Sequence, residues 1–268
     1  MEHTPHQFDA ETWAQLPDYF KNLPEAIRLH VWGDGQATPA EGEAIRLARM
    51  LDDRFDKIDH RVLPRRINYA YYPVIGIFRM EEDVAVDHGL RIIGLPAGYQ
   101  LTSLIAAIQC VAFRGATSEA TTRIQLSRLS RPVDIEILTS AEDQQGPELA
   151  QIAFNMAVFS PLIRTFVVMA DNYPDALVRY SVNELPHTVI NGRIHVEGIV
   201  DEKVLLQHIA AAIRSQSEAD DSGQALPGGP RPWKAPETGL KEPGQPAVQR
   251  PILSVRQMRK TSSGCWRL

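Results

Sequence analysis

The two cysteines are the residues best suited to redox chemistry, but their spacing does not favour it. Cys110 and Cys265 are the only cysteines in 268 residues, and they lie far apart in the chain. Dithiol exchange needs one thiolate to attack a disulfide and a second thiol to resolve the mixed disulfide. Cys110 falls in an apolar helical pattern, where cysteine acts as a small hydrophobic side chain. Cys265 lies in a polar C-terminal stretch, where we expect an exposed thiol that is open to modification or intermolecular disulfide formation.

The eight histidines show no spacing that predicts a metal site. His187 and His195 flank Asn191-Gly192, a dipeptide that favours a two-residue hairpin turn. Such a turn pairs His187 with Val196, and the alternation of side chains then sends the two imidazoles to opposite faces of the sheet. The chain also lacks a phosphate-binding loop, a nucleophile elbow and a dinucleotide fingerprint. We therefore expect no metal and no cofactor.

Composition and charge exclude several classes of protein. Apolar residues make up 44% of the chain and charged residues 23%, as in soluble globular proteins. The formal net charge of −5 argues against nucleic acid as the main partner. No run of eighteen apolar residues predicts a membrane span, and the N-terminus lacks the basic start and apolar core of a secretory signal. We expect a cytoplasmic protein in a reducing environment.

The elements that would position these residues form two similar halves after an amphipathic leader helix at 8–21. The first half is expected to contain a strand at 26–32, a helix at 40–53, strands at 58–63, 73–80 and 90–94, and a closing helix beginning near residue 101. The second half is expected to contain a strand at 133–138, a helix opened by residue 147, a strand at 165–170, a helix at 173–180, the hairpin, and a helix at 201–213.

The composition changes near Ser217. From there to Leu268 the chain has seven prolines and six glycines, and beyond Pro246 it has five basic residues and no acid. Such a segment cannot bury enough apolar surface to offset the entropy of ordering it, so we predict a disordered basic tail. The predicted organisation is a leader at 1–24, a first domain at 25–115, a second domain at 130–216 and the tail at 217–268.

Two segments carry a resemblance to a known family. They read Leu-Arg-Ile-Ile-Gly-Leu-Pro-Ala-Gly-Tyr at 90–99 and Leu-Pro-His-Thr-Val-Ile-Asn-Gly at 185–192. With its repeated element order, the chain resembles the tandem-thioredoxin family of bacterial and archaeal protein disulfide oxidoreductases, also called glutaredoxin-like proteins. The N-terminal domain of the alkyl hydroperoxide reductase flavoprotein belongs to the same group. The resemblance spans residues 25–215 and implies an α/β fold of two tandem thioredoxin-like domains, with central mixed sheets flanked by helices.

The resemblance implies a redox motif that the chain does not contain. In the family's second unit, Cys-Pro-Tyr-Cys-Pro opens the helix after the first strand. Here the same place reads Asp143-Gln144-Gln145-Gly146-Pro147, so Asp143 and Gly146 stand at the cysteine positions. The corresponding loop of the first unit, residues 33–42, has no cysteine either. We predict that dithiol exchange is lost and that Asp143 is an acid at a helix N-terminus.

The resemblance also gives a role to two prolines. In the family, a cis proline faces the cysteine motif, and the residue before it hydrogen-bonds the backbone of an extended substrate. Tyr72-Pro73 and Leu185-Pro186 would do this here. A groove kept without thiols would suit peptide binding through strand-like backbone contacts, and the alternative is that the prolines only shape the fold.

Three functions remain open at this stage. The first is a redox-inactive protein that binds another protein through the proline groove or through tail residues 251–268, as an adaptor, a chaperone-like protein or an accessory factor. The second is a thiol-disulfide oxidoreductase that uses Cys110, Cys265 or a partner's thiol. The third is a structural subunit of a larger assembly. The sequence identifies neither the partner nor the oligomeric state.

Overall fold

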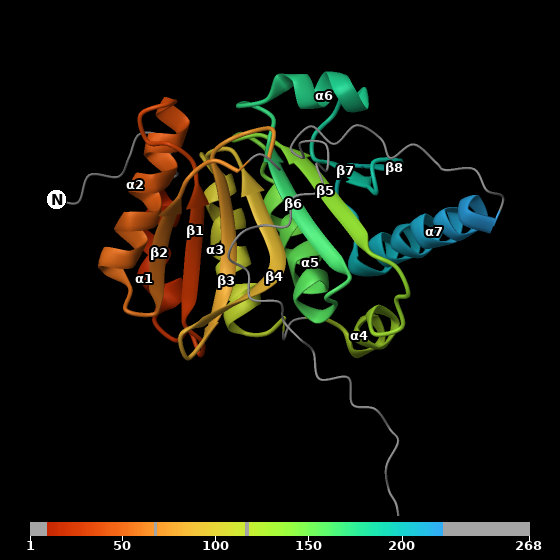
Figure 1. Cartoon of the computed structure of the whole chain (residues 1–268), viewed down its shortest axis with the longest axis horizontal. Helices are drawn as coiled ribbons and strands as arrows, with labels where there is room; N and C mark the ends of the chain where they lie inside the picture. Colours follow the sequence, from red (N-terminus) through yellow and green to blue (C-terminus); the bar gives the residue numbers. More distant parts are fainter. Residues whose placement is uncertain (1–9, 67–68, 116–117, 222–268) are drawn as a thin grey trace, which may run out of the picture. The chain divides into compact units, whose positions relative to one another are not determined.

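The computed structural model describes residues 10–66, 69–115 and 118–221, with side chains up to residue 217 (Figure 1). Its centre is one eight-stranded sheet in the order β2-β1-β3-β4-β6-β5-β7-β8. The strands are β1 (Ile27–Trp32), β2 (Ile58–Leu63), β3 (Val74–Glu81), β4 (Val84–Ile93), β5 (Val133–Thr139), β6 (Ile163–Met169), β7 (His187–Ile190) and β8 (Ile194–Glu197). The helices are α1 (Ala10–Phe20), α2 (Pro39–Arg54), α3 (Gln100–Ala112), α4 (Ala120–Leu126), α5 (Gly146–Phe159), α6 (Pro174–Tyr180) and α7 (Glu202–Asp221).

The sheet contains the predicted repeat. In the first half, β1 lies between a parallel neighbour, β2, and an antiparallel neighbour, β3, and β3 pairs with β4. In the second half, β5 lies between parallel β6 and antiparallel β7, and β7 pairs with β8. The order and direction of the strands are therefore the same in both halves, which confirms the two tandem α/β units.

The two units do not keep separate sheets, in contrast to the expectation of one sheet per unit. The outer strand of the first unit, β4, pairs in parallel with β6 of the second, from Leu90 opposite Thr165 to Ile93 opposite Val168. Each of these strands would otherwise leave a row of backbone donors and acceptors without partners. The join satisfies both edges and makes one continuous sheet, whose strands lie side by side across the centre of Figure 1.

The helices cover the two faces unequally. Alternate residues of β1 (Ile27, Leu29 and Val31) point to one face, where they form a single apolar core with α1, α2, α3, α5 and α7. On the opposite face, residues of α6 pack with an aromatic group that includes Trp32, Phe78 and Phe166. The helices α2 and α5, which follow the first strand of each unit, therefore lie on the same side of the sheet.

Two helices differ from the sequence prediction. Helix α4 was not predicted, since it is one short element in which only Thr122 and Leu126 are buried. Helix α7 continues to Asp221, past the predicted end at Ile213, so the first residues assigned to the disordered tail are helical. The remainder of the predicted tail lies outside the described residues. Within the described ranges, no helix is long and apolar enough to span a lipid bilayer.

Candidate functional site

Both proline loops lie at the same end of the sheet. Strands β1, β4, β6 and β5 all run in one direction, so the carboxyl ends of β1 and β5 lie at this end. Pairing of Trp32 with Val74 continues to Gly33 beside Pro73, and pairing of Leu138 with His187 continues to Thr139 beside Pro186. Both Tyr72-Pro73 and Leu185-Pro186 are cis. We define the first proline site as residues 33–41 with 72–73, and the second proline site as residues 139–146 with 185–186.

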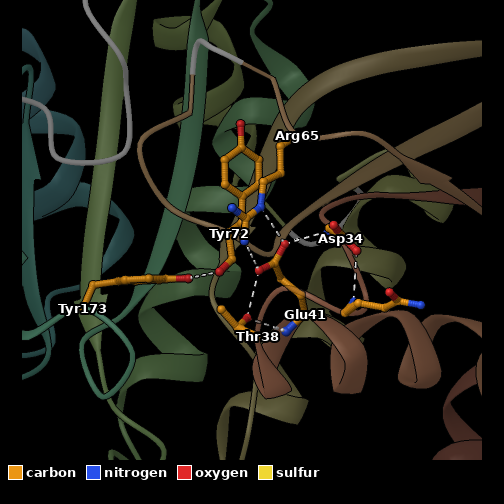
Figure 2. Close-up of polar contacts among 7 residues, drawn as sticks. Asp34, Thr38, Glu41, Arg65, Tyr72 and Tyr173 are labelled. Carbon is orange, nitrogen blue, oxygen red and sulfur yellow. Dashed lines mark hydrogen bonds and ion pairs between the residues drawn. The ribbon is translucent and has the colours of Figure 1, made fainter.

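The first proline site is built around a buried carboxylate (Figure 2). Thr38 caps α2, and its side chain exchanges hydrogen bonds with Glu41, accepting from the backbone N–H at 3.3 Å and donating to the carboxylate at 2.8 Å. The Thr38 side chain thus acts as an N-cap that satisfies one N–H group of the first helical turn, and the Glu41 carboxylate holds the Thr38 hydroxyl in place. Glu41 is 0% exposed and also accepts from the Asp34 N–H at 2.6 Å.

Arg65 neutralises this carboxylate with two charged hydrogen bonds. Its Nε donates to one carboxylate oxygen of Glu41 at 3.0 Å and its Nη2 to the other at 2.5 Å. Burial alone would raise the pKa of Glu41, but the hydrogen bonds from Arg65, from the Asp34 N–H and from Thr38 together lower it. Glu41 is therefore an ionised structural acid, with no proton to donate at neutral pH.

A tyrosine from the second unit occupies the first proline site. The hydroxyl of Tyr173 donates to the carbonyl oxygen of Tyr72 at 2.5 Å, as Figure 2 shows. The Tyr173 ring stacks on Tyr71, with ring centroids 4.3 Å apart. Burial raises the pKa of Tyr173, which keeps its hydroxyl protonated and able to donate. The carbonyl that would meet an extended peptide at this site is already bonded within the chain.

The second proline site differs, because its carboxylate, Asp143, hydrogen-bonds the backbone N–H groups at the start of α5. One carboxylate oxygen accepts from the N–H groups of Gln145 at 2.9 Å and Gly146 at 3.0 Å, and the other accepts from the Thr139 hydroxyl at 2.7 Å. A carboxylate at this place satisfies free N–H groups and is stabilised by the positive end of the α5 dipole. The geometry matches the role of a helix N-terminal acid.

No side chain fits at Gly146 without rearrangement. A Cβ atom there would lie 2.3 Å from Thr139 Oγ1 and 2.8 Å from Asp143 Oδ2. Gln100, which is fully buried, closes the site from α3 by donating to the carbonyl oxygens of Ser140 and Asp143, both at 2.9 Å. The space that a second cysteine would need is filled by these groups.

Leu185 keeps its backbone free, unlike Tyr72. Within the described part of the chain, neither its N–H nor its carbonyl has a hydrogen-bond partner, whereas the following Pro186 accepts from the Gly198 N–H at 2.9 Å. Its side chain is half-buried. A free donor and a free acceptor on one residue can pair with one residue of an added strand.

Cys110 lies in the core. It is 4% exposed, on the side of α3 that packs on α5, with its Sγ 3.8 Å from the Gln151 carbonyl oxygen. Burial raises the pKa of the thiol to about 12, so almost no thiolate exists at neutral pH. This agrees with a packing role. Cys265 lies outside the described residues.

The prediction for the two histidines was wrong. His187 pairs with Glu197, and Val189 with His195, because Asn191, Gly192 and Arg193 all lie between the paired ends of the hairpin. The extra residue shifts the register by one and brings both imidazoles to the same face, with His187 Nε2 and His195 Nδ1 2.9 Å apart. No group of three or more metal-ligating side chains occurs among the described residues.

Sequence reasoning missed Glu41 in the first proline site, and it missed Arg65 and Tyr173, which bond to residues of that site. Glu41 was detectable, because Thr38 followed by Glu41 has the spacing of a capping box before an apolar helix. Arg65 and Tyr173 gave no such signal, since they reach the site from loops remote in the chain.

Known proteins share this architecture. This chain is 26% identical to the alkyl hydroperoxide reductase protein AhpF from Pseudomonas aeruginosa over 214 residues, which is 80% of this chain and 39% of that protein. The N-terminal (NTD_N/C) domain of the corresponding Enterococcus faecalis protein superimposes with a TM-score of 0.68 at 17% identity, covering 75% of this chain and 99% of that domain. The chain has a tandem thioredoxin fold. The resemblance found in the sequence is therefore confirmed.

Two further comparisons agree with this fold. A protein disulfide oxidoreductase from Aeropyrum pernix superimposes with a TM-score of 0.68 at 18% identity, over 77% of this chain and 94% of that one. The Bacillus subtilis protein named NADH dehydrogenase is 22% identical over 82% of this chain and 40% of its own length. This tandem thioredoxin chain thus spans well under half the length of the curated relatives it matches. No family model matches it.

Proposed function

We propose that this protein binds another protein without performing dithiol exchange, and that it binds through the second proline site. Two features of the second site support the absence of dithiol exchange. Asp143 accepts a hydrogen bond at the start of α5, where the family has a cysteine, and the space beside Gly146 is filled by other side chains. Its free Leu185 backbone can pair with an extended segment. Tail residues 251–268, which lie outside the described residues, are a second candidate contact.

An insulin-reduction assay tests the absence of exchange. With dithiothreitol as the reductant, we expect the protein to leave the rate of insulin precipitation unchanged, because neither proline site supplies a thiolate. The control is Cys110→Ser, which should behave identically. A rate enhancement that disappears in a cysteine variant would contradict the proposal.

Copurification from the native host then locates the binding surface. The full chain is compared with a chain ending at Asp221, where α7 ends. Recovery of the same partner by both chains would assign binding to the folded units. Recovery by the full chain alone would assign it to the C-terminal segment, and would contradict a role for the second proline site.

A redox role is the second candidate, because the relatives carry the names of reductases and dehydrogenases. Burial of Cys110 leaves Cys265 or a thiol on a partner as the group that could react. The insulin assay with Cys265→Ser separates this function from pure binding. Activity lost in that variant would establish the redox role.

A further inference from the structure

The second proline site has apolar side chains at its surface. Tyr99 is 43% exposed and donates its backbone N–H to the Ala141 carbonyl oxygen, and its hydroxyl accepts from Gln144 at 2.9 Å. Ile199 is 38% exposed and follows Gly198, whose N–H donates to Pro186. These two side chains and the half-buried Leu185 can contact the apolar side chains of a bound segment.

The segments that form and border this site are acidic. Residues 94–100, 139–148, 169–175 and 181–188 contain no lysine or arginine. The carboxylates in these segments are Glu142, Asp143, Glu148, Asp171, Asp175 and Glu184. Of these, Asp143 is bonded to the start of α5, and Asp175 accepts from the Tyr71 hydroxyl beside the first proline site. Asp171 is held against the site because it accepts from the Ala141 N–H at 2.5 Å.

The two proline sites therefore differ in charge. At the first site, Glu41 is neutralised by Arg65, and Arg66 stacks over the Trp32 ring at 5.0 Å. The four segments at the second site contain no cation, Arg179 of α6 and Lys203 lie outside them in the chain, and Glu142 and Glu184 are exposed. An uncompensated acidic surface attracts a cationic partner and repels an anionic one, which fixes specificity and increases the association rate.

We propose that the second proline site binds an extended segment in which basic and apolar residues alternate. This rests on the proposed function. The Leu185 backbone pairs with the backbone of the segment, Leu185, Tyr99 and Ile199 contact its apolar side chains, and Glu142 and Glu184 bind its lysines or arginines. The first site takes no such segment, because Tyr173 occupies the Tyr72 carbonyl.

Isothermal titration calorimetry with two blocked peptides tests this on the full chain. The probes are acetyl-Lys-Val-Lys-Val-Lys-amide and acetyl-Glu-Val-Glu-Val-Glu-amide. We expect the lysine peptide to bind with one site per chain and about tenfold more tightly than the glutamate peptide at low salt. The difference should shrink at high salt, where screening shortens the range of surface charges.

The variant Glu142→Lys/Glu184→Lys should abolish the preference for the lysine peptide. The matched control is Glu119→Lys, an exposed residue before α4 and remote from the site, which should retain it. Equal affinity for the two peptides, or an equal loss in the control, would overturn the charge selection while leaving protein binding intact. Failure of both peptides to bind would overturn the proposed function itself.

Discussion

A methyl group added at Gly146 tests the filled space at the second proline site. In Gly146→Ala, the new Cβ would lie 2.3 Å from Thr139 Oγ1, well inside van der Waals contact, while the nearest atom of Gln100 would be 3.0 Å away. Thr139 is fully buried and its hydroxyl is bonded to Asp143, so it cannot rotate away without losing that hydrogen bond.

Two opposing effects set the size of the change. Forcing an extra carbon into a packed site costs about 1–3 kcal/mol. Replacing glycine by alanine in a compatible backbone restricts the unfolded chain and recovers about 0.4–1 kcal/mol. We expect a net loss of about 1–2 kcal/mol in the free energy of unfolding, or a Tm lower by about 2–4 °C for each kcal/mol.

Urea unfolding followed by tryptophan fluorescence measures this loss, and a double-mutant cycle assigns its cause. In a Thr139→Ala background the clashing oxygen is absent, so Gly146→Ala should cost less than it does in the wild-type protein. The control is Gly35→Ala, where the nearest atom is the end of a flexible side chain, Ile45 Cδ1, at 3.3 Å. A Gly146→Ala protein as stable as wild type, or an equal cost in both backgrounds, would refute the packing argument.

Three other predictions concern titration and reactivity. The pKa of Glu41 is lowered in the folded protein, so its ionised carboxylate stabilises the fold above the pKa of the unfolded chain, and this stabilisation is lost as pH falls through the folded pKa. The difference in the free energy of unfolding between wild type and Glu41→Gln, measured by urea unfolding, should therefore narrow on acidification. Burial and nearby His195 lower the pKa of His187, so protonation favours the unfolded chain as pH falls below the ordinary pKa of histidine. In His187→Phe, the Tm should therefore fall less steeply with decreasing pH than in the wild-type protein. An unchanged slope of Tm against pH would contradict this. In Cys265→Ser, the remaining thiol of Cys110 should resist Ellman's reagent under mildly alkaline conditions until urea unfolds the protein.

The sequence predicted those parts of the fold that depend on local patterns. Strand β2 has the predicted bounds, because a proline at residue 64 ends the run that begins at Ile58. Asp143 could be interpreted at once, since it lies within reach of the N–H groups two and three residues on. Here the chemistry is contained within a few consecutive residues.

Register and long-range contacts were beyond this kind of reasoning. Asn191-Gly192 marked the hairpin correctly, but whether Arg193 joins the loop or the strand depends on the pairing with β5, where Asn191 Oδ1 accepts from the Asp134 N–H at 2.8 Å. The bond from Tyr173 to Tyr72 joins residues 101 positions apart, and no periodicity encodes it.

The pairing of β4 with β6 joins the two repeats into one continuous sheet, so backbone hydrogen bonds resist rotation of one repeat against the other. The cis prolines precede β3 and β7, which are four strand spacings apart, so the two prolines are held about 19 Å from one another. After cleavage of the chain between the repeats, near Leu129, the backbone hydrogen bonds between β4 and β6 would still hold the two repeats together. Either repeat expressed alone would expose the edge of β4 or β6, which the other repeat normally covers, and would tend to aggregate through that edge.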